Sequence, residues 1–189
     1  MIFRPLLLGI AMLLLAACGH SPPTQFLTLD PVPGAAVAYR GPAIRVPAVR
    51  VPPALDRDEF VQRGAPGEVK VDDLVRWSGS LGLLARNTLI LDLASRLPPS
   101  AVAPPDAPAQ SAGVRIDVSI LVLETTDNEA SMQAAWQFTP DSGQTSATSR
   151  QWATLSLPIA GRTPPETARA FSALLGQLAD RIAGDLISR

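Results

Sequence analysis

The stretch Val114-Arg115-Ile116-Asp117-Val118-Ser119-Ile120-Leu121-Val122-Leu123 decides the fold class of this chain. Apolar and polar residues alternate from Val114 to Ile120, which places every second side chain on one face of a β-strand. The run then stays apolar through Leu121-Val122-Leu123, which predicts a central strand covered on both faces. A strand of this kind needs neighbouring strands and a covering layer, and the rest of the chain is expected to supply both.

The chain beyond this stretch supplies two more strands. Alternating patterns predict strands at 131–138 and 151–157, each with one apolar face. The residues expected to share those apolar faces are Met132, Ala134, Trp136, Phe138, Ala153, Leu155 and Leu157. A turn-rich connection separates the two strands, so we expect them to pair in antiparallel fashion. Trp136 is predicted to lie in the core. The same position is favoured for Trp77 and Trp152, with a surface that faces lipid or a partner as the alternative.

A strong helix signal closes the sequence. Thr163-Pro164-Pro165-Glu166 places threonine at the N-cap, proline in the first turn and glutamate at N3, which is a capping-box arrangement. Apolar residues then recur at spacings of three or four, at Phe171, Leu175, Leu178, Ile182 and Leu186. This pattern predicts an amphipathic helix that packs its apolar face over the sheet.

The chain before the opening stretch is expected to add short strands and a second helix. Strands are predicted at 25–29, 43–51 and 60–63, with a short extended piece within 68–77. Pro47 interrupts the second of these strands and predicts a sheet edge or a strand end there, because proline has no backbone N–H to donate.

The second helix is predicted at 80–97, with Ser80 as its N-cap and Pro98-Pro99 as its stop. Its apolar stripe is expected to contain Leu81, Leu84, Thr88, Leu91 and Ser95, broadened by Leu89, Leu93 and Leu97. The proline-rich segment 98–113 is predicted to be an extended, solvated loop, with a surface insertion favoured over a recognition segment. The predicted fold class is therefore α+β: a single domain with a mixed or antiparallel sheet and two main helices packed on it.

The first residues have the layout of a secretory signal. Arg4 gives a short positive region, Leu6 to Ala17 is apolar, and small residues precede Cys18. A helix over this apolar run would cover roughly 18 Å at ~1.5 Å per residue. That is less than the ~30 Å hydrocarbon core of a bilayer, so the segment is read as an export signal and not as a membrane span.

Leu15-Ala16-Ala17-Cys18 resembles the lipobox of bacterial lipoproteins. Cleavage is then expected between Ala17 and Cys18, with lipid attached to the Cys18 thiol, and several acyl chains together give stable anchoring. Residues 1–17 would form the signal peptide, 18–24 a lipidated tether and 25–189 the folded domain. Gly19 follows the cysteine where an inner-membrane retention signal commonly has Asp, which favours the periplasmic face of the outer membrane.

The composition argues against several kinds of site. A formal net charge of −1 provides no basic field for nucleic acid. The only histidine, His20, lies two residues after Cys18, so no Ser–His pair is expected in the domain. Lys70, the only lysine, is read as a solvated charge, and Asp56, Asp58 and Glu59 as a solvated turn without the spacing of a calcium loop. We therefore expect no catalytic site, metal or cofactor, and predict a binding or tethering protein that is not an enzyme.

Three segments resemble the ABC-type transport auxiliary lipoproteins, a family that includes the paraquat-inducible operon lipoprotein. Leu55-Asp56-Arg57 with Arg63 is similar to its Leu-Asp-Arg-Pro-Gln-Ile-Val-x-Arg pattern, with Asp58 in place of the usual proline. Arg76-Trp77 is similar to its Arg-Trp-Ala-Glu-Pro-Leu, and Phe26-Leu27-Thr28-Leu29 to its Tyr-Tyr-x-Leu. The resemblance spans the mature chain, since the later strands and the closing helix come in the expected order.

The resemblance implies a non-catalytic component of an intermembrane lipid transport system. Its expected partner is a periplasmic substrate-binding protein of the MCE type, served by a permease and its ATPase, and a homo-oligomer is among the assemblies it allows. The motif residues Leu55, Asp56, Arg57, Arg63, Arg76 and Trp77 are expected either to form a docking surface or to determine the fold. The alternative function is a general envelope scaffold that binds a β-barrel or cell-wall partner.

Overall fold

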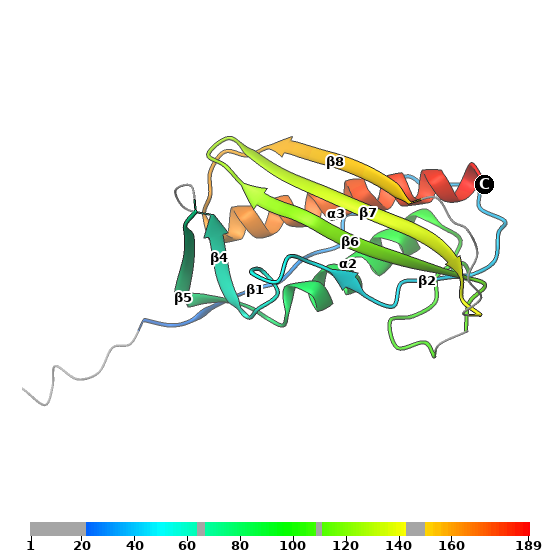
Figure 1. The fold of residues 1–189 in the computed structure, drawn as a ribbon, viewed down its shortest axis with the longest axis horizontal. Helices are drawn as coiled ribbons and strands as arrows, with labels where there is room; N and C mark the ends of the chain where they lie inside the picture. The colour runs from blue at the N-terminus through cyan, green and yellow to red at the C-terminus, as the bar shows by residue number, and fades with distance from the viewer. Residues whose placement is uncertain (1–21, 64–66, 109–110, 143–149) are drawn as a thin grey trace, which may run out of the picture.

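A computed structural model describes residues 22–63, 67–108, 111–142 and 150–189; Cys18 and the signal segment lie outside these described residues. The elements are β1 (Gln25–Leu27), β2 (Ile44–Arg45), β3 (Val49–Arg50), β4 (Glu59–Arg63), β5 (Val69–Trp77), α2 (Leu81–Arg96), β6 (Val114–Thr125), β7 (Glu129–Pro140), β8 (Gln151–Pro158) and α3 (Pro164–Ile187). The predicted α+β class is confirmed. Its strands divide into two sheets, and the two helices lie side by side against one face of the larger sheet (Figure 1).

The larger sheet has the strand order β2-β6-β7-β8, with β3 also paired to β6. The strands β7 and β8 continue the sheet from β6 in antiparallel fashion, as predicted, whereas β2 and β3 run parallel to β6. The predicted strand at 43–51 is split into β2 and β3 around Pro47, which cannot donate to a strand ladder. The split leaves two short segments, each paired with the first half of β6.

The central strand β6 is not covered on both faces, so that expectation is wrong. Ile116, Val118 and Ile120 are buried at alternate positions, but Leu121 is 45% exposed. The pairing with β7 shifts register between Ile120 and Val122, so Leu121 is the extra residue of a β-bulge. The apolar run therefore marks a change in phase, after which Leu123 becomes the inward residue.

The closing helix α3 forms as the sequence predicts. The backbone N–H of Thr163 donates to the Glu166 carboxylate at 3.1 Å, as a capping box requires. All five residues of the predicted apolar stripe are buried: Phe171, Leu175, Leu178, Ile182 and Leu186. The helix packs this face against α2 and against β7 and β8 of the larger sheet.

The helix α2 begins within a residue of its predicted start, but its cap and part of its buried face differ from the prediction. Ser80 makes no side-chain capping bond, and the Asp56 carboxylate accepts the N–H of Gly82 instead, at 3.1 Å. A Cβ atom at Gly82 would lie 3.0 Å from the Val49 carbonyl oxygen, so a larger residue would crowd the start of this helix. Leu91 is 54% exposed, because the buried face of the helix lies over Thr88, Leu89, Asp92, Leu93 and Arg96.

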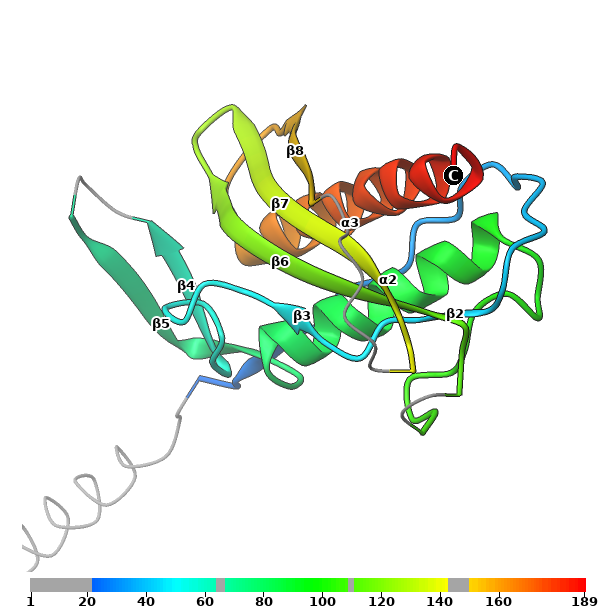
Figure 2. The same cartoon turned by 45° about the vertical axis from the view of Figure 1, so that its right-hand side comes forward.

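The smaller sheet has the order β1-β5-β4. The strand β5 is much longer than the short extended piece expected within 68–77, and it forms a hairpin with β4. The strand β1 pairs parallel to the end of β5 that lies nearest the body, with Leu27 opposite Trp77. The outer part of the hairpin projects away from the larger sheet (Figure 2).

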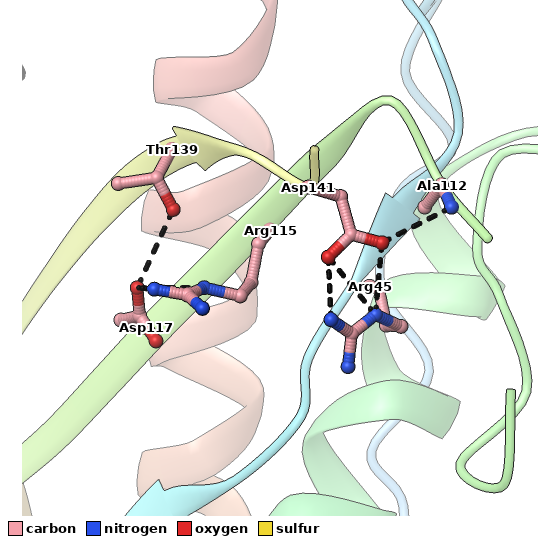
Figure 3. Close-up of polar contacts among 6 residues, drawn as sticks. All are labelled: Arg45, Ala112, Arg115, Asp117, Thr139 and Asp141. Carbon is pink, nitrogen blue, oxygen red and sulfur yellow. Dashed lines mark hydrogen bonds and ion pairs between the residues drawn. The ribbon is translucent and has the colours of Figure 1, made fainter. Parts of the chain in front are cut away.

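The segment 98–113 is not wholly a solvated loop. Ala101 is buried, and hydrogen bonds of 2.8 Å join Ile44 to the carbonyl of Ala101 and to the N–H of Ala103. The far end of this segment is also held, because the N–H of Ala112 donates to the Asp141 carboxylate at 3.2 Å (Figure 3). The proline-rich stretch therefore contributes a short bridge beside β2.

The three tryptophans do not share one environment. Trp136 is buried, as predicted, and its indole N–H donates to Asp185 of α3 at 3.0 Å. Trp77 is also buried. The prediction for Trp152 is wrong, since its side chain is 61% exposed. It lies on the outward side of the edge strand β8, one position out of phase with the inward Ala153 and Leu155.

Candidate functional site

A cleft of about 250 Å³ separates the β4–β5 hairpin from the second half of β6. Val61 and Val69 line it from the hairpin, Leu121 and Leu123 line it from β6, and Phe171 of α3 contributes from below. The walls are therefore largely aliphatic. A concave, apolar surface with a few polar groups is the usual form of a binding site, so this cleft is the candidate site.

The cleft exists because the chain leaves the sheet at Pro52-Pro53. Before this point β3 lies against β6, and its last paired residue is Arg50, opposite Ser119. Proline cannot continue a strand ladder, so the chain turns away and returns as β4 in the other sheet. Pro52 and Leu55 of this connection line one end of the cleft.

An aromatic cluster fixes the root of the hairpin beneath the cleft. The ring of Trp77 packs between Phe60, at a centroid distance of 5.7 Å, and Phe171, at 6.4 Å. Phe60 belongs to β4, Trp77 ends β5, and Phe171 belongs to α3. All three side chains are buried, so the hairpin base is tied firmly to the helix layer.

The open end of the cleft carries an ion pair. The Arg63 guanidinium lies 2.9 Å from the Glu124 carboxylate, and the two side chains are 67% and 31% exposed. The Arg63 carbonyl oxygen accepts a hydrogen bond of 2.6 Å from Nη2 of Arg162. The Gln62 amide donates to the carbonyl oxygen of Arg162 at 2.6 Å, so the loop before α3 supports the hairpin.

The six family-motif residues do not form one surface. Leu55 and Arg63 line the cleft, and Trp77 lies in the aromatic cluster beneath it. Asp56 accepts from the first turn of α2, and Arg57 forms a 2.8 Å ion pair with Glu59. Arg76 is exposed beside Phe26, on a different part of the surface. Asp56 and Trp77 thus lie in structural positions, whereas Leu55 and Arg63 lie at the cleft, and a docking role for the motif stays a prediction.

A buried polar cluster between the two helices was not foreseen from the sequence. The buried Arg96 of α2 donates to Asp180 of α3 at 2.6 Å and to the carbonyl oxygens of Val32 and Gly176 at 2.9 and 3.0 Å. The cluster ties both helices to the segment that follows β1. The spacing of the leucines in α2 predicts an apolar face, and no local pattern indicates that Asp92 and Arg96 are buried beside it.

Asp92 lies in the same cluster and carries an unusual carboxyl group. One of its oxygens accepts the N–H of Val32 at 2.6 Å, while the other is buried without a hydrogen-bond partner among the described residues. Burial raises the pKa of Asp92 to about 6, against the opposing effects of the Val32 N–H and of Arg96. This carboxyl group lies between the helices and not at the cleft, so we assign it a structural role.

The charges that line the cleft largely offset one another. Its lining charges are Arg63, Glu68 and Glu124, and the first and last of these neutralise each other. Among residues 22–63, 67–108, 111–142 and 150–189, no group of three His, Cys, Asp or Glu side chains is arranged to hold a metal ion. Within the same ranges, no helix combines the length and apolar character needed to cross a bilayer.

Comparisons with known proteins identify the family. Residues 27–183 match the ABC-type transport auxiliary lipoprotein component family. No curated protein matches the sequence significantly. The fold is similar to a crystal structure described only as an uncharacterized protein, with a TM-score of 0.69, 19% identity, and coverage of 87% of this chain and 99% of the other. It is also similar to protein XCC0632 from Xanthomonas campestris, of family DUF330, with a TM-score of 0.62, 15% identity and coverage of 87% and 95%.

Both structural similarities establish the fold alone, because the identities are low. The family match covers most of the chain and agrees with the family resemblance seen at Leu55-Asp56-Arg57, Arg63 and Arg76-Trp77. On this evidence, the chain belongs to the family of ABC-type transport auxiliary lipoprotein components.

Proposed function

We propose that this protein is a non-catalytic docking component of an ABC-type system that moves lipid between the two membranes of the bacterial envelope. Its partner in this proposal is a periplasmic substrate-binding protein of the MCE type. The observation that carries the proposal is the match of residues 27–183 to a family of transport auxiliary lipoproteins. The family association itself extends only to an ABC transport system.

The lipobox supports a membrane-anchored position. In this proposal residues 1–17 are removed, Cys18 carries the lipid and residues 18–24 form a tether to the domain. Gly19 supports delivery to the outer membrane, with the domain in the periplasm. The folded part begins with β1 at Gln25, so a tether of a few residues holds the smaller sheet within about 30 Å of the bilayer, at ~3.5 Å per extended residue.

The cleft supports a docking role in preference to a catalytic one. It combines aliphatic walls with one ion pair, and neither a nucleophile with an adjacent base nor a metal cluster is present among the described residues that line it. The other conspicuous exposed aromatic residues, Phe26 and Trp152, lie on separate surfaces. We therefore take the cleft, and not those surfaces, as the docking site.

The test is affinity purification of the lipidated protein from native membranes after mild crosslinking, with mass spectrometry of proteins and lipids. We expect recovery of an MCE-type protein together with its permease and ATPase. A Cys18→Ala variant, exported but not lipidated, should lose this recovery while its domain stays folded. Recovery of β-barrel assembly or cell-wall proteins alone would contradict the transport function and support the envelope scaffold.

A further inference from the structure

The wall that β6 contributes to the cleft is a strand edge and not a strand face. Five consecutive residues of β6, from Leu121 to Thr125, line the cleft. A cavity against the face of a strand contacts every second residue, because side chains alternate between the two faces. Contact with every residue in turn means that the main chain itself borders the cleft.

This edge has no partner in the described part of the chain. On one side β6 pairs with β7 along its whole length, up to Thr125. On the other side its pairing with β3 ends at Ser119. The strand β4 lies near β6, but among the described residues no strand pairs with the edge from Leu121 onward and no backbone hydrogen bond reaches it. The opposite wall is β4, whose one strand partner within the described ranges is β5. The cleft therefore occupies the position that β3 would fill if it continued past Pro52.

Unpaired main-chain groups favour one kind of occupant. An extended peptide can supply the donors and acceptors that the edge lacks, and its alternate side chains can enter the apolar cleft. A lipid acyl chain would fill the apolar space but leave the same donors and acceptors without partners. The volume of about 250 Å³ corresponds to about eight water molecules at ~30 Å³ each, which suits small side chains.

The charges at the cleft add a second preference. Two carboxylates, Glu68 and Glu124, and one guanidinium, Arg63, line it. The guanidinium is already paired with Glu124, so Glu68 leaves one net negative charge. A segment with a basic residue near one end complements this charge.

We propose that the cleft binds an extended segment of a partner protein, which adds to the free edge of β6 at Leu121–Thr125 as the strand that β3 does not provide. The segment carries small apolar residues at alternate positions and a basic residue near one end. This inference rests on the proposed function, in which a periplasmic partner docks on this protein, and it identifies the docking site and the form of the partner segment.

The first test selects binding peptides with a library of random heptapeptides displayed on phage. We expect wild-type protein to enrich sequences with alternating small apolar residues. The Val69→Trp variant fills the cleft from the hairpin and should weaken binding of the enriched peptide about tenfold or more, the equivalent of one or two hydrogen bonds. Leu74→Trp is the matched control, because Leu74 is exposed on the same strand but does not line the cleft. No enrichment, or equal binding to both variants, would overturn the proposal.

The second test separates strand addition from simple apolar binding. The enriched peptide is synthesised with N-methyl groups at alternate amides, in the two complementary sets. The set that removes the donors facing β6 should weaken binding about tenfold, since an added strand presents alternate amides to each neighbour. If neither set weakens binding, or if a fatty acid displaces the peptide, the cleft is a lipid site and the proposal fails.

The copurification experiment keeps this inference distinct from the proposed function. If the Val69→Trp variant recovers the transport partner as well as wild type does, the partner docks elsewhere and only the inference fails. If wild type recovers no transport partner, the proposed function fails, while peptide binding at the cleft is still decided by the peptide experiments.

Discussion

The two halves of β6 differ in what lies against their outer edge. From Val114 to Ser119 this edge is covered by β2 and β3. Across this closed half, Arg45 of β2 binds Asp141 through two nitrogens, one of them at 3.0 Å, and the side chains are only 13% and 1% exposed (Figure 3). From Leu121 to Thr125, the open half, the only ion pair across the cleft among the described residues is the exposed Arg63–Glu124 pair.

The same strand thus stabilises the fold along one half and offers an edge along the other. A buried and fully bonded ion pair is costly to break, whereas an exposed pair contributes little and can yield to a partner. Exposed strand edges invite unwanted pairing, and proteins normally cover or blunt them. The projecting hairpin narrows access to the open half, which limits unwanted pairing with the free edge.

The largest expected effect tests whether the hairpin root is as rigid as the closed half. Trp77→Ala removes a buried ring from between Phe60 and Phe171 and should lower the free energy of unfolding by about 4 kcal/mol, through lost burial and the cavity left behind. Urea denaturation followed by circular dichroism measures this change. Trp152→Ala is the matched control and should change stability by no more than about 0.5 kcal/mol, since its ring is exposed. Similar losses in the two variants would refute a rigid root.

The next effect tests the buried Arg45–Asp141 ion pair of the closed half. Asp141→Ala leaves the Arg45 guanidinium and the Ala112 N–H without their acceptor and should destabilise the fold by about 3 kcal/mol. Glu124→Ala, at the open half, should cost less than about 1 kcal/mol. Both variants are compared with wild type by urea denaturation at pH 7. The contrast between the two halves fails if Glu124→Ala costs as much as Asp141→Ala.

Lowering the pH should change the contributions of Asp141 and Asp92 to the stability of the fold in opposite directions. The hydrogen bond from Arg45 lowers the pKa of Asp141, so its stabilising effect is present above the unfolded pKa and is lost as pH falls through the folded pKa. Burial raises the pKa of Asp92 from 3.8 to about 6, so the folded state binds the extra proton and this group favours folding most below pH 4. That contribution is lost as pH rises through 6.

An Asp92→Asn variant isolates the second effect. Asparagine keeps an acceptor for the Val32 N–H and removes the charge, so it should stabilise the protein at pH 7.5, by up to about 3 kcal/mol. The advantage over wild type should shrink toward pH 4, where Asp92 is protonated in the folded state. Urea denaturation of both proteins at the two pH values gives this difference, in which other titrating groups cancel. An advantage that does not change with pH would contradict the raised pKa.

Much of the fold follows from local patterns in the sequence. The capping box at Thr163 and the apolar spacing behind it predict α3 closely, and the alternation at Ile116 and Val118 predicts a central strand. These signals are strong because one residue type repeats at the period of the element. The division into two sheets and the length of β5 were not predicted, since strand pairing depends on contacts between distant segments.

The cleft could be predicted only in part. The motif directs attention to Leu55 and Arg63, which do line it, but it also contains Asp56, whose role is to cap α2. The apolar run at Leu121 predicted a strand buried on both faces, whereas the structure has a β-bulge there. Both arrangements give the same apolar run, so the sequence does not distinguish them. A strand edge is free when no other strand pairs with it. Local sequence patterns do not show which distant strands will pair, so a single sequence does not predict a free edge.

A smaller effect tests the structural role of the motif residue Asp56 at the start of α2. Asp56→Ala removes the acceptor for the Gly82 N–H at the start of α2, and loss of such a cap costs about 1 kcal/mol. Asp58→Ala is the control, because Asp58 is exposed and no side-chain hydrogen bond of it is seen among the described residues. Equal stability of the two variants in thermal denaturation would mean that Asp56 does not cap the helix.

The smallest expected effect is the most informative about the open half. A double-mutant cycle of Arg63→Ala and Glu124→Ala should give a coupling energy of about 0.5 kcal/mol, which should fall further in 0.5 M salt, because Arg63 is exposed and Glu124 is partly exposed. Urea denaturation of the four proteins measures it. A coupling well above 1 kcal/mol would mean that the pair locks the hairpin onto β6. The hairpin would then cover the open half of β6, and a partner strand would have to break a strong ion pair before it could reach the edge.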